Sequence, residues 1–204
     1  MYGRIRGKYP TGLDAPNLQR QHNLFHDIWV STDGHEIADE VEKFGARVHG
    51  RDEETATYYA PSILAIKEFL QKHGDIEVIA LLQCTSPFTK VDYLTEAFNK
   101  IISGEYDSVF SVTRQHKLFW TPHEDGTIIP DNFDVENRPR RQDWAGQLVE
   151  TGMFYFFQTS LIRHNVLQGG RIGYVEVPKD HSLEIDTEFD LQVARAISRI
   201  SEGS

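Results

Sequence analysis

The sequence contains few of the features that mark disulfide-bonded, membrane-spanning or nucleic-acid-binding chains. Its single cysteine, Cys84, excludes a disulfide within the chain and favours a reducing compartment. No apolar run approaches the roughly 20 residues needed to span a bilayer. Basic residues are also scarce, because 21 Lys and Arg face 31 Asp and Glu, for a net charge of -10. We therefore expect no nucleic-acid partner and no membrane insertion, and an anionic ligand would require a local basic cluster or a metal ion.

The N-terminal residues do not have the pattern of a secretory signal. They carry Arg4, Arg6 and Lys8 among prolines and glycines, without an apolar segment. Because they show no clear periodicity, we expect residues 1–27 to form an irregular leader and residues 28–204 to form one domain. With 39% hydrophobic residues overall, the composition is that of an ordinary globular chain that can bury a sizeable core.

The apolar pattern predicts strands and helices in alternation. Strands are predicted at 28–32, 46–49, 77–83 and 108–113, with helices between them at 36–44, 59–73 and 93–102. This order predicts a three-layer α/β fold with a mostly parallel sheet covered by helices. The order then changes. The polar, proline-containing stretch at about 116–147 is predicted to be an inserted arm, and strands at 153–158 and 172–177 and a helix at 188–200 complete the domain.

Polar side chains follow several of the predicted strands. These segments lie at 31–33, 83–87, 114–116 and 181–190. In an open α/β sheet, ligands bind beyond the carboxyl ends of the strands. Each segment alone is most simply a turn with capping residues, but the four together indicate a binding edge.

A basic cluster lies in the predicted arm, where Arg138, Arg140 and Arg141 occur within four positions. Guanidinium groups form bidentate hydrogen bonds to phosphate and carboxylate, which makes the cluster a candidate anion contact. A solvated basic patch or a nuclear import signal explains the same residues. The two interpretations have similar weight and are compatible.

Two carboxylates near the C-terminus are candidate metal ligands. Glu184 and Asp186 are two residues apart, so they point to the same side of an extended segment. Such a pair suits a Mg²⁺ site that also uses substrate oxygens. The alternative is that Asp186 or Thr187 caps the last helix. Spacing alone favours the cap.

Taken in order, several motifs resemble the animal CMP-sialic acid synthetases, or N-acylneuraminate cytidylyltransferases. They lie at 29–33, 83–87, 106–112, 138–144, 152–155, 167–170 and 181–190, so the resemblance runs from Ile28 to the C-terminus. It implies the nucleotide-diphospho-sugar transferase fold, which is Rossmann-like. It also implies Mg²⁺-dependent transfer of CMP from CTP to the anomeric 2-hydroxyl of sialic acid, with release of pyrophosphate. The KDO cytidylyltransferases share the fold but resemble the arm less well.

The resemblance also implies roles for single residues and for the arm. Arg141, Gln142 and Asp186 correspond to catalytic groups, with Asp186 and Glu184 as metal ligands. The implied substrate contacts are Gln83, Arg141, Gln142, Tyr155, Arg51 and Ser62, of which Tyr155 belongs to the sialic acid site and the last two to the nucleotide. The arm corresponds to a dimerisation element that reaches into the partner's active site, so we expect a homodimer or larger homo-oligomer.

Two departures from the family pattern affect what is expected of this chain. Glu184 stands where the family usually has Asp, and its side chain is one methylene longer. Residues 2–27 match neither the first strand of the family nor its Gly/Ser/Lys loop that holds the CTP phosphates. The alternative function is therefore a truncated, inactive member that acts only as a dimer partner. The basic run at 137–141 predicts the nucleus or cytoplasm, whereas insect relatives indicate the Golgi and secretory pathway.

Overall fold

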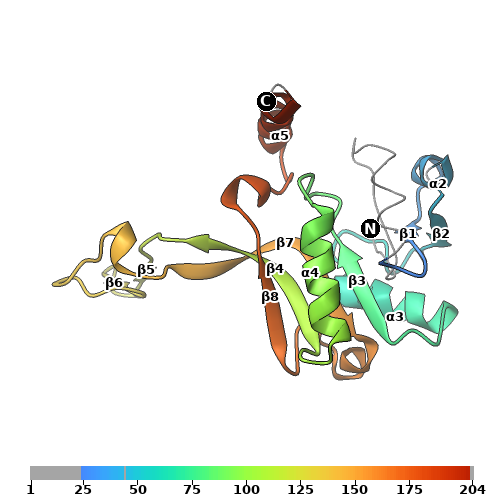
Figure 1. The fold of residues 1–204 in the computed structure, drawn as a ribbon, viewed down its shortest axis with the longest axis horizontal. Coiled ribbons are helices and arrows are strands. Elements are labelled where there is room, and N and C mark those ends of the chain that lie inside the picture. Colours follow the sequence, from blue (N-terminus) through green and yellow to red (C-terminus); the bar gives the residue numbers. More distant parts are fainter. Residues whose placement is uncertain (1–23, 44, 203–204) are drawn as a thin grey trace.

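The computed structural model describes residues 24–43 and 45–202 (Figure 1). Most of the expected leader, and the stretch expected to lack a phosphate-binding loop, therefore lie outside the described residues. The main sheet has four strands, which are β3 (Val78–Leu82), β7 (Gln147–Gln158), β4 (Ser108–Gln115) and β8 (Ile172–Glu176), in that spatial order. The predicted α/β class is confirmed.

Strand direction in this sheet is mixed. β4 and β8 pair in parallel, and β7 lies between β3 and β4, antiparallel to both. Three of the four strands therefore run in one direction, which agrees with the expected mostly parallel sheet. The central position of β7 departs from the simple alternation of strands and helices. This strand begins at Gln147, six residues before the predicted start, because it continues the pairing with β4 into the arm.

Helices on both faces of the sheet make the three layers. They are α3 (Ser62–Lys72) and α4 (Val91–Ile102). In β3, Ala80 and Leu82 pack in one apolar cluster with α4, whereas Ile79 and Leu81 pack in a second cluster with α3. Burial on both faces explains the unbroken apolar run of this strand. α3 was predicted from Tyr59 but begins after Pro61, which has an extended conformation.

A smaller unit precedes the main sheet. β1 (Trp29–Thr32) pairs in parallel with β2 (Arg47–Gly50), and α2 (His35–Lys43) connects them. The Trp29 ring contacts α3 and its C-terminal cap, with its centroid 5.8 Å from Phe69 and 4.1 Å from His73. Phe25 is only 1% exposed and packs against Phe98 and Phe156. Residues just before β1 thus belong to the core.

The arm projects from the main sheet (Figure 1). Its stalk is the outer part of β4 and β7, and its tip holds a hairpin of β5 (Trp120–Pro122) and β6 (Ile128–Pro130), followed by the short helix η1 (Arg141–Asp143). Large apolar side chains are exposed on it, namely Phe119, Trp120, Ile128, Ile129, Val135 and Leu148.

The chain ends with η2 (Thr159–His164), η3 (Lys179–His181) and α5 (Glu188–Glu202). α5 was predicted over nearly the same residues, from Glu188 to Ile200. Within the described ranges, none of the helices has the length and apolarity required to cross a bilayer.

Candidate active site

A large bulge in β7 shapes the candidate site. Phe110 of β4 pairs with Tyr155, but Val112 pairs with Glu150, so residues 151–154 stand opposite Ser111 alone. Ser111 is fully buried, and its hydroxyl accepts hydrogen bonds from the Thr151 hydroxyl at 2.8 Å and the Phe154 N–H at 3.2 Å. A bulge leaves ladder groups without strand partners. Here the Ser111 hydroxyl takes the place of a strand carbonyl as the acceptor for the Phe154 N–H.

Gly152 makes room for a carboxylate at the centre of the bulge. Its φ is +66°, and a β-carbon at this position would lie 2.1 Å from Oε1 of Glu184. The segment that carries Glu184 is fixed to the turn after β3, because the Ile185 N–H donates to the Thr85 carbonyl at 2.8 Å. Gln83 joins the same region, since its N–H donates to the Met153 carbonyl at 3.1 Å. Gln83 and Glu184 were both predicted site residues, and the fold anchors both to the bulge region.

Tyr155 lies near two carboxylates, those of Glu150 and Glu184. Its hydroxyl donates to Glu150, and the Gln168 side-chain amide donates to Glu150 at 2.8 Å. Burial raises the pKa of Tyr155, and the hydrogen bond to Glu150 and the charges of Glu150 and Glu184 raise it further. The phenol therefore stays neutral at physiological pH. Glu150 and Gln168 were not among the predicted site residues. A sequence signal existed for them, since Gln168 lies within a family-like motif and Glu150 just before another.

The carboxylates repel one another electrostatically. Burial raises the pKa of Glu184, and the negative charges of Asp186 and Glu150 add to this effect. A bound cation would stabilise the charged form of Glu184 and so offset the effects of burial and of the neighbouring negative charges. Within residues 24–43 and 45–202, no group of three or more His, Cys, Asp or Glu side chains is arranged to hold a metal ion by itself. A metal here would need oxygen ligands from a substrate or water.

Thr187, rather than Asp186, caps the last helix. The Thr187 N–H donates to the Asp190 carboxylate at 2.8 Å, and the Asp190 N–H donates to the Thr187 hydroxyl at 3.3 Å, which is a reciprocal capping box. Asp186 contributes its backbone N–H, which donates to the same carboxylate at 3.2 Å. The capping alternative is therefore confirmed for Thr187. It does not use the exposed carboxylate of Asp186, the predicted metal ligand.

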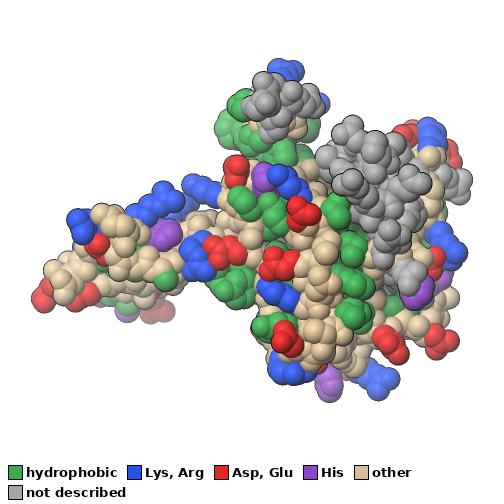
Figure 2. Space-filling model, viewed as in Figure 1, with side chains coloured by type: hydrophobic (Ala, Val, Ile, Leu, Met, Phe, Trp, Pro, Cys, Tyr) green, Lys and Arg blue, Asp and Glu red, His purple; other side chains and the backbone are tan. Residues whose placement is uncertain are grey.

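The three arginines of the arm have different surroundings. Arg140 pairs with Asp143 at 2.9 Å, and the Arg138 guanidinium lies 5.7 Å from the centre of the Phe133 ring. Arg141 lines a pocket of about 150 Å³ at the root of the arm, together with Arg114, Gln115, His116, Lys117 and Lys179. Basic side chains gather along the arm and at its root (Figure 2). The cluster thus divides into local arm contacts and one basic pocket.

Arg141 and Gln142 are not brought to the carboxylates of their own chain. Both are exposed on η1. Among the described residues, no hydrogen bond or ion pair joins either of them to Tyr155, Glu184 or Asp186. Arg141 instead lines the basic pocket at the root of the arm, beside Arg114 and Lys179.

The two predicted nucleotide contacts lie at opposite ends of one loop. Arg51 follows β2, and its backbone N–H donates to the Thr32 carbonyl at the end of β1, at 3.1 Å. Ser62 is the first residue of α3. The loop between them therefore starts at the carboxyl edge of the β1–β2 pair, the edge at which α/β folds bind ligands.

Comparisons with known proteins point to one family. The family model described as "Cytidylyltransferase" matches residues 18–198. N-acylneuraminate cytidylyltransferase A of Danio rerio is 42% identical over 175 residues, which are 84% of this chain and 41% of that protein. The corresponding protein of Oncorhynchus mykiss is 38% identical, covering 83% of this chain and 40% of its own. An Escherichia coli N-acylneuraminate cytidylyltransferase is 30% identical over 88% of this chain and 43% of that protein. The chain thus spans about two fifths of the length of these relatives.

Two solved structures share the fold. A 4-diphosphocytidyl-2C-methyl-D-erythritol synthase from Anaerococcus prevotii superposes with a TM-score of 0.60 at 14% identity, covering 86% of this chain and 82% of that chain. A CMP:2-keto-3-deoxy-manno-octonic acid synthetase complexed with CTP gives a TM-score of 0.58 at 12% identity, covering 86% and 81%. The expected α/β fold class is confirmed by both. Neither structure bears on the roles of individual residues.

Proposed function

The chain belongs to the cytidylyltransferase family, and on that basis we propose that it supplies the sugar-side active site of an N-acylneuraminate cytidylyltransferase. The reaction transfers CMP from CTP to the anomeric 2-hydroxyl of sialic acid and releases pyrophosphate. The single observation that carries the proposal is the group formed by Tyr155, Glu150 and Glu184 around the Gly152 bulge. It occurs in a chain up to 42% identical to proteins with that name.

The residues of the bulge suit recognition of a polyhydroxylated acid. Tyr155 presents a neutral phenol beside Glu150, and Gln168 presents an amide beside the same carboxylate. Hydroxyl groups of a sugar both donate and accept, so they can bond to a carboxylate and an amide together. Gln83, after β3, lies beside the same bulge. We assign these groups to binding and orienting the sugar, which is how phosphoryl-transfer enzymes lower the barrier when they form no covalent intermediate.

Mg²⁺ fits the carboxylates at the end of this site. Mg²⁺ prefers oxygen ligands and is commonly held by one or two carboxylates plus substrate phosphates. Glu184, whose pKa is raised by burial and by neighbouring negative charge, and the exposed Asp186 meet that description. Glu184 replaces the shorter Asp of the family, and Gly152 leaves space for the longer side chain. When bound, the ion would neutralise charge on the transferred phosphate.

We further propose that the arm completes the site of a second copy. Arg141 and Gln142 do not contact the carboxylates of their own chain, although the resemblance assigns them to the substrate. The exposed apolar side chains of the arm, among them Trp120 and Ile129, fit an interface. In a dimer, the basic pocket lined by Arg141 would offset the net charge of -10 and attract an anionic substrate.

The basic run at 137–141 supports nuclear import as the proposed location. Arg138, Arg140 and Arg141 are exposed, as a receptor-read signal requires. A Golgi location, as for insect relatives, is the competing proposal. Imaging of the tagged protein before and after Arg138→Ala and Arg140→Ala distinguishes them, because only the nuclear signal depends on these side chains.

The direct test is incubation of the purified chain with CTP, sialic acid and Mg²⁺, with release of pyrophosphate as the readout. We expect product formation that requires both substrates and stops on addition of a chelator. Replacing sialic acid by KDO tests the related specificity, and we expect little product. A chain that dimerises but yields no pyrophosphate would contradict the proposal and support the non-catalytic dimer partner.

A further inference from the structure

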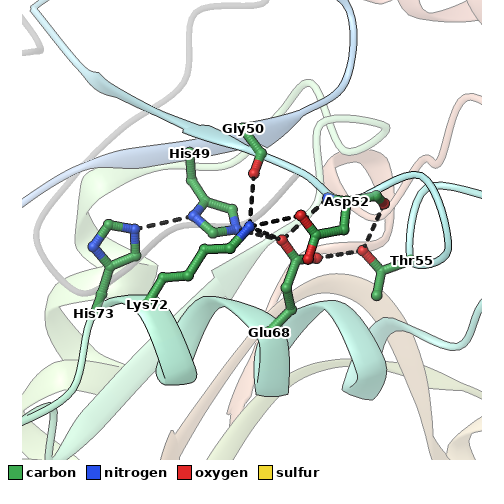
Figure 3. Close-up of polar contacts among 7 residues, drawn as sticks. All are labelled: His49, Gly50, Asp52, Thr55, Glu68, Lys72 and His73. Carbon is green, nitrogen blue, oxygen red and sulfur yellow. Dashed lines mark hydrogen bonds and ion pairs between the residues drawn. The ribbon is translucent and has the colours of Figure 1, made fainter.

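Glu68, a buried carboxylate of α3, holds the loop that joins β2 to α3. Its side chain is only 6% exposed. Oε1 accepts a hydrogen bond from the Asp52 N–H at 3.1 Å, and Oε2 accepts one from the Thr55 hydroxyl (Figure 3). One side chain of the helix thus fixes both the backbone and a side chain in the first part of the loop.

Cationic and imidazole groups surround the same carboxylate. Lys72, one turn further along α3, donates to Glu68 at 2.8 Å, to the Asp52 carboxylate at 2.8 Å and to the Gly50 carbonyl at 3.3 Å. The buried His49 of β2 lies 3.1 Å from Glu68 and 3.0 Å from His73 (Figure 3). The network therefore joins α3 to the end of β2 as well as to the loop.

The carboxylate stays charged throughout the physiological range. Burial raises the pKa of Glu68, but the hydrogen bonds from Lys72, Thr55 and the Asp52 N–H outweigh it and lower the pKa to about 2. Burial lowers the pKa of His49, so this imidazole is mostly neutral at neutral pH. A charged acceptor makes stronger hydrogen bonds than a neutral one, so Glu68 is suited to hold the loop in one arrangement.

Glu68 and Lys72 together join the first part of the loop to α3. The internal backbone hydrogen bonds of the loop are short-range turns, from Thr55 and Ala56 to Asp52 and from Ala60 to Thr57. Further along, Tyr58 and Tyr59 are 95% and 88% exposed. Asp52 and Thr55 are the points at which this segment is bound to the helix.

We propose that Glu68 is a positioning residue for the nucleotide side of the active site. The loop it holds begins directly after Arg51 and leads to Ser62 at the start of α3, so a shift at Asp52 moves the neighbouring Arg51 and changes its position relative to Ser62. Glu68 acts through the loop and does not touch the nucleotide. This inference rests on the proposed function, in which Arg51 and Ser62 contact CTP.

The test measures CTP and sialic acid binding separately, by calorimetry, for three variants of the full chain. Glu68→Gln keeps the size of the side chain but removes its charge. Thr55→Val removes one hydrogen bond to Glu68 and leaves the ion pairs in place. Glu96→Gln is the matched control, because Glu96 of α4 pairs with Lys100 at 2.6 Å in the same i,i+4 relationship, on the surface. Hydrogen exchange of residues 50–62 reports the loop independently of ligand.

We expect Glu68→Gln to weaken CTP binding about tenfold, because the loop loses the charged acceptor that holds Asp52 and Thr55. Thr55→Val should have a smaller effect of the same kind. Both variants should exchange faster at residues 50–62, and sialic acid binding should be unchanged. Glu96→Gln should behave as the wild type. Thr55→Val decides the question if Glu68→Gln does not fold.

Three results would overturn the inference, and they differ from one another. Equal loss of CTP and sialic acid binding would make Glu68 a residue of general stability. Faster exchange in the loop with unchanged CTP binding would remove the positioning role while leaving the proposed function intact. Failure of the wild-type chain to bind CTP would remove the proposed function and this assignment with it.

Discussion

The carboxylate of Glu184 occupies the space that a side chain on residue 152 would take. A β-carbon on Gly152 would lie 2.1 Å from Oε1 of Glu184 and 2.8 Å from its carboxyl carbon. Real non-bonded atoms do not approach so closely, so either Glu184 or the bulge must move. The position of a candidate metal ligand therefore depends on the absence of a side chain on the neighbouring strand.

Gly152→Ala is accordingly expected to displace Glu184 as well as to strain the backbone. The φ of +66° alone should cost about 1–2 kcal/mol of unfolding free energy in alanine. Gly104→Ala is the matched control, because Gly104 has a φ of +74° with nothing within 4 Å of its β-carbon position. Urea unfolding should show a larger loss for Gly152→Ala, and only that variant should lose product formation. Equal losses and equal activity would contradict the packing argument.

Ser111→Ala should destabilise the bulge. Removing the hydroxyl leaves the buried Thr151 hydroxyl and Phe154 N–H without this acceptor, at a cost of about 1–3 kcal/mol for a buried unsatisfied group. Ser108→Ala is the control, since Ser108 is on the same strand as Ser111 and its buried hydroxyl bonds to the backbone of Gly169 instead of to the bulge. Denaturant unfolding should show comparable losses for both. A raised KM for sialic acid is expected for Ser111→Ala alone, and its appearance in both variants would argue against a specific role of the bulge.

The sequence predicts the layers well because their signals are local. The apolar run of β3 and the helical spacing in α4 are visible in short windows, and both elements occur within two residues of the predicted ends. The start of α3 was predicted too early, since the apolar spacing does not register the effect of Pro61. A proline disfavours the helical conformation in the residue before it.

The geometry of the site depends on contacts that are distant in sequence. Glu150 meets Tyr155 because β4 and β7 pair with a bulge. Nothing in either strand alone predicts the register at which they pair. In the same way, Thr85 meets Ile185 across 100 positions of the chain. The residue types of the site could be identified from motifs, but their mutual arrangement could not.

Asp186→Asn is expected to abolish Mg²⁺-dependent product formation without destabilising the fold. The Asp186 side chain is exposed and the helix cap uses only its N–H, so folding has little need of the carboxylate. Asp190→Asn is the opposite case, because its carboxylate forms the cap and its loss should cost about 1 kcal/mol. Pyrophosphate release across a Mg²⁺ titration, together with thermal unfolding, separates the two. Full turnover by Asp186→Asn would remove the metal assignment.

Acid should destabilise the network around Glu68 in a defined pH range. The pKa of Glu68 falls from an ordinary value of 4.5 to about 2 on folding, so the unfolded chain binds a proton at a higher pH than the folded chain does. Its stabilising contribution is complete above pH 4.5, declines as the pH falls toward 2, and amounts to a few kcal/mol at most, at about 1.4 kcal/mol per pH unit. The lowered pKa of His49 acts in the same direction at higher pH, because the buried imidazole resists protonation.

Urea unfolding of the wild type and of Glu68→Gln, measured at a series of pH values, tests this expectation. The difference in unfolding free energy between the two proteins should be constant at neutral pH and should shrink as the pH falls below 4.5. Glu96→Gln should show no such change, because its ion pair is exposed and such pairs contribute about 0.3–0.5 kcal/mol. A difference that stays constant down to pH 2 would mean that the charge of Glu68 does not stabilise the fold. The loop would then be held by the shape of the side chain alone.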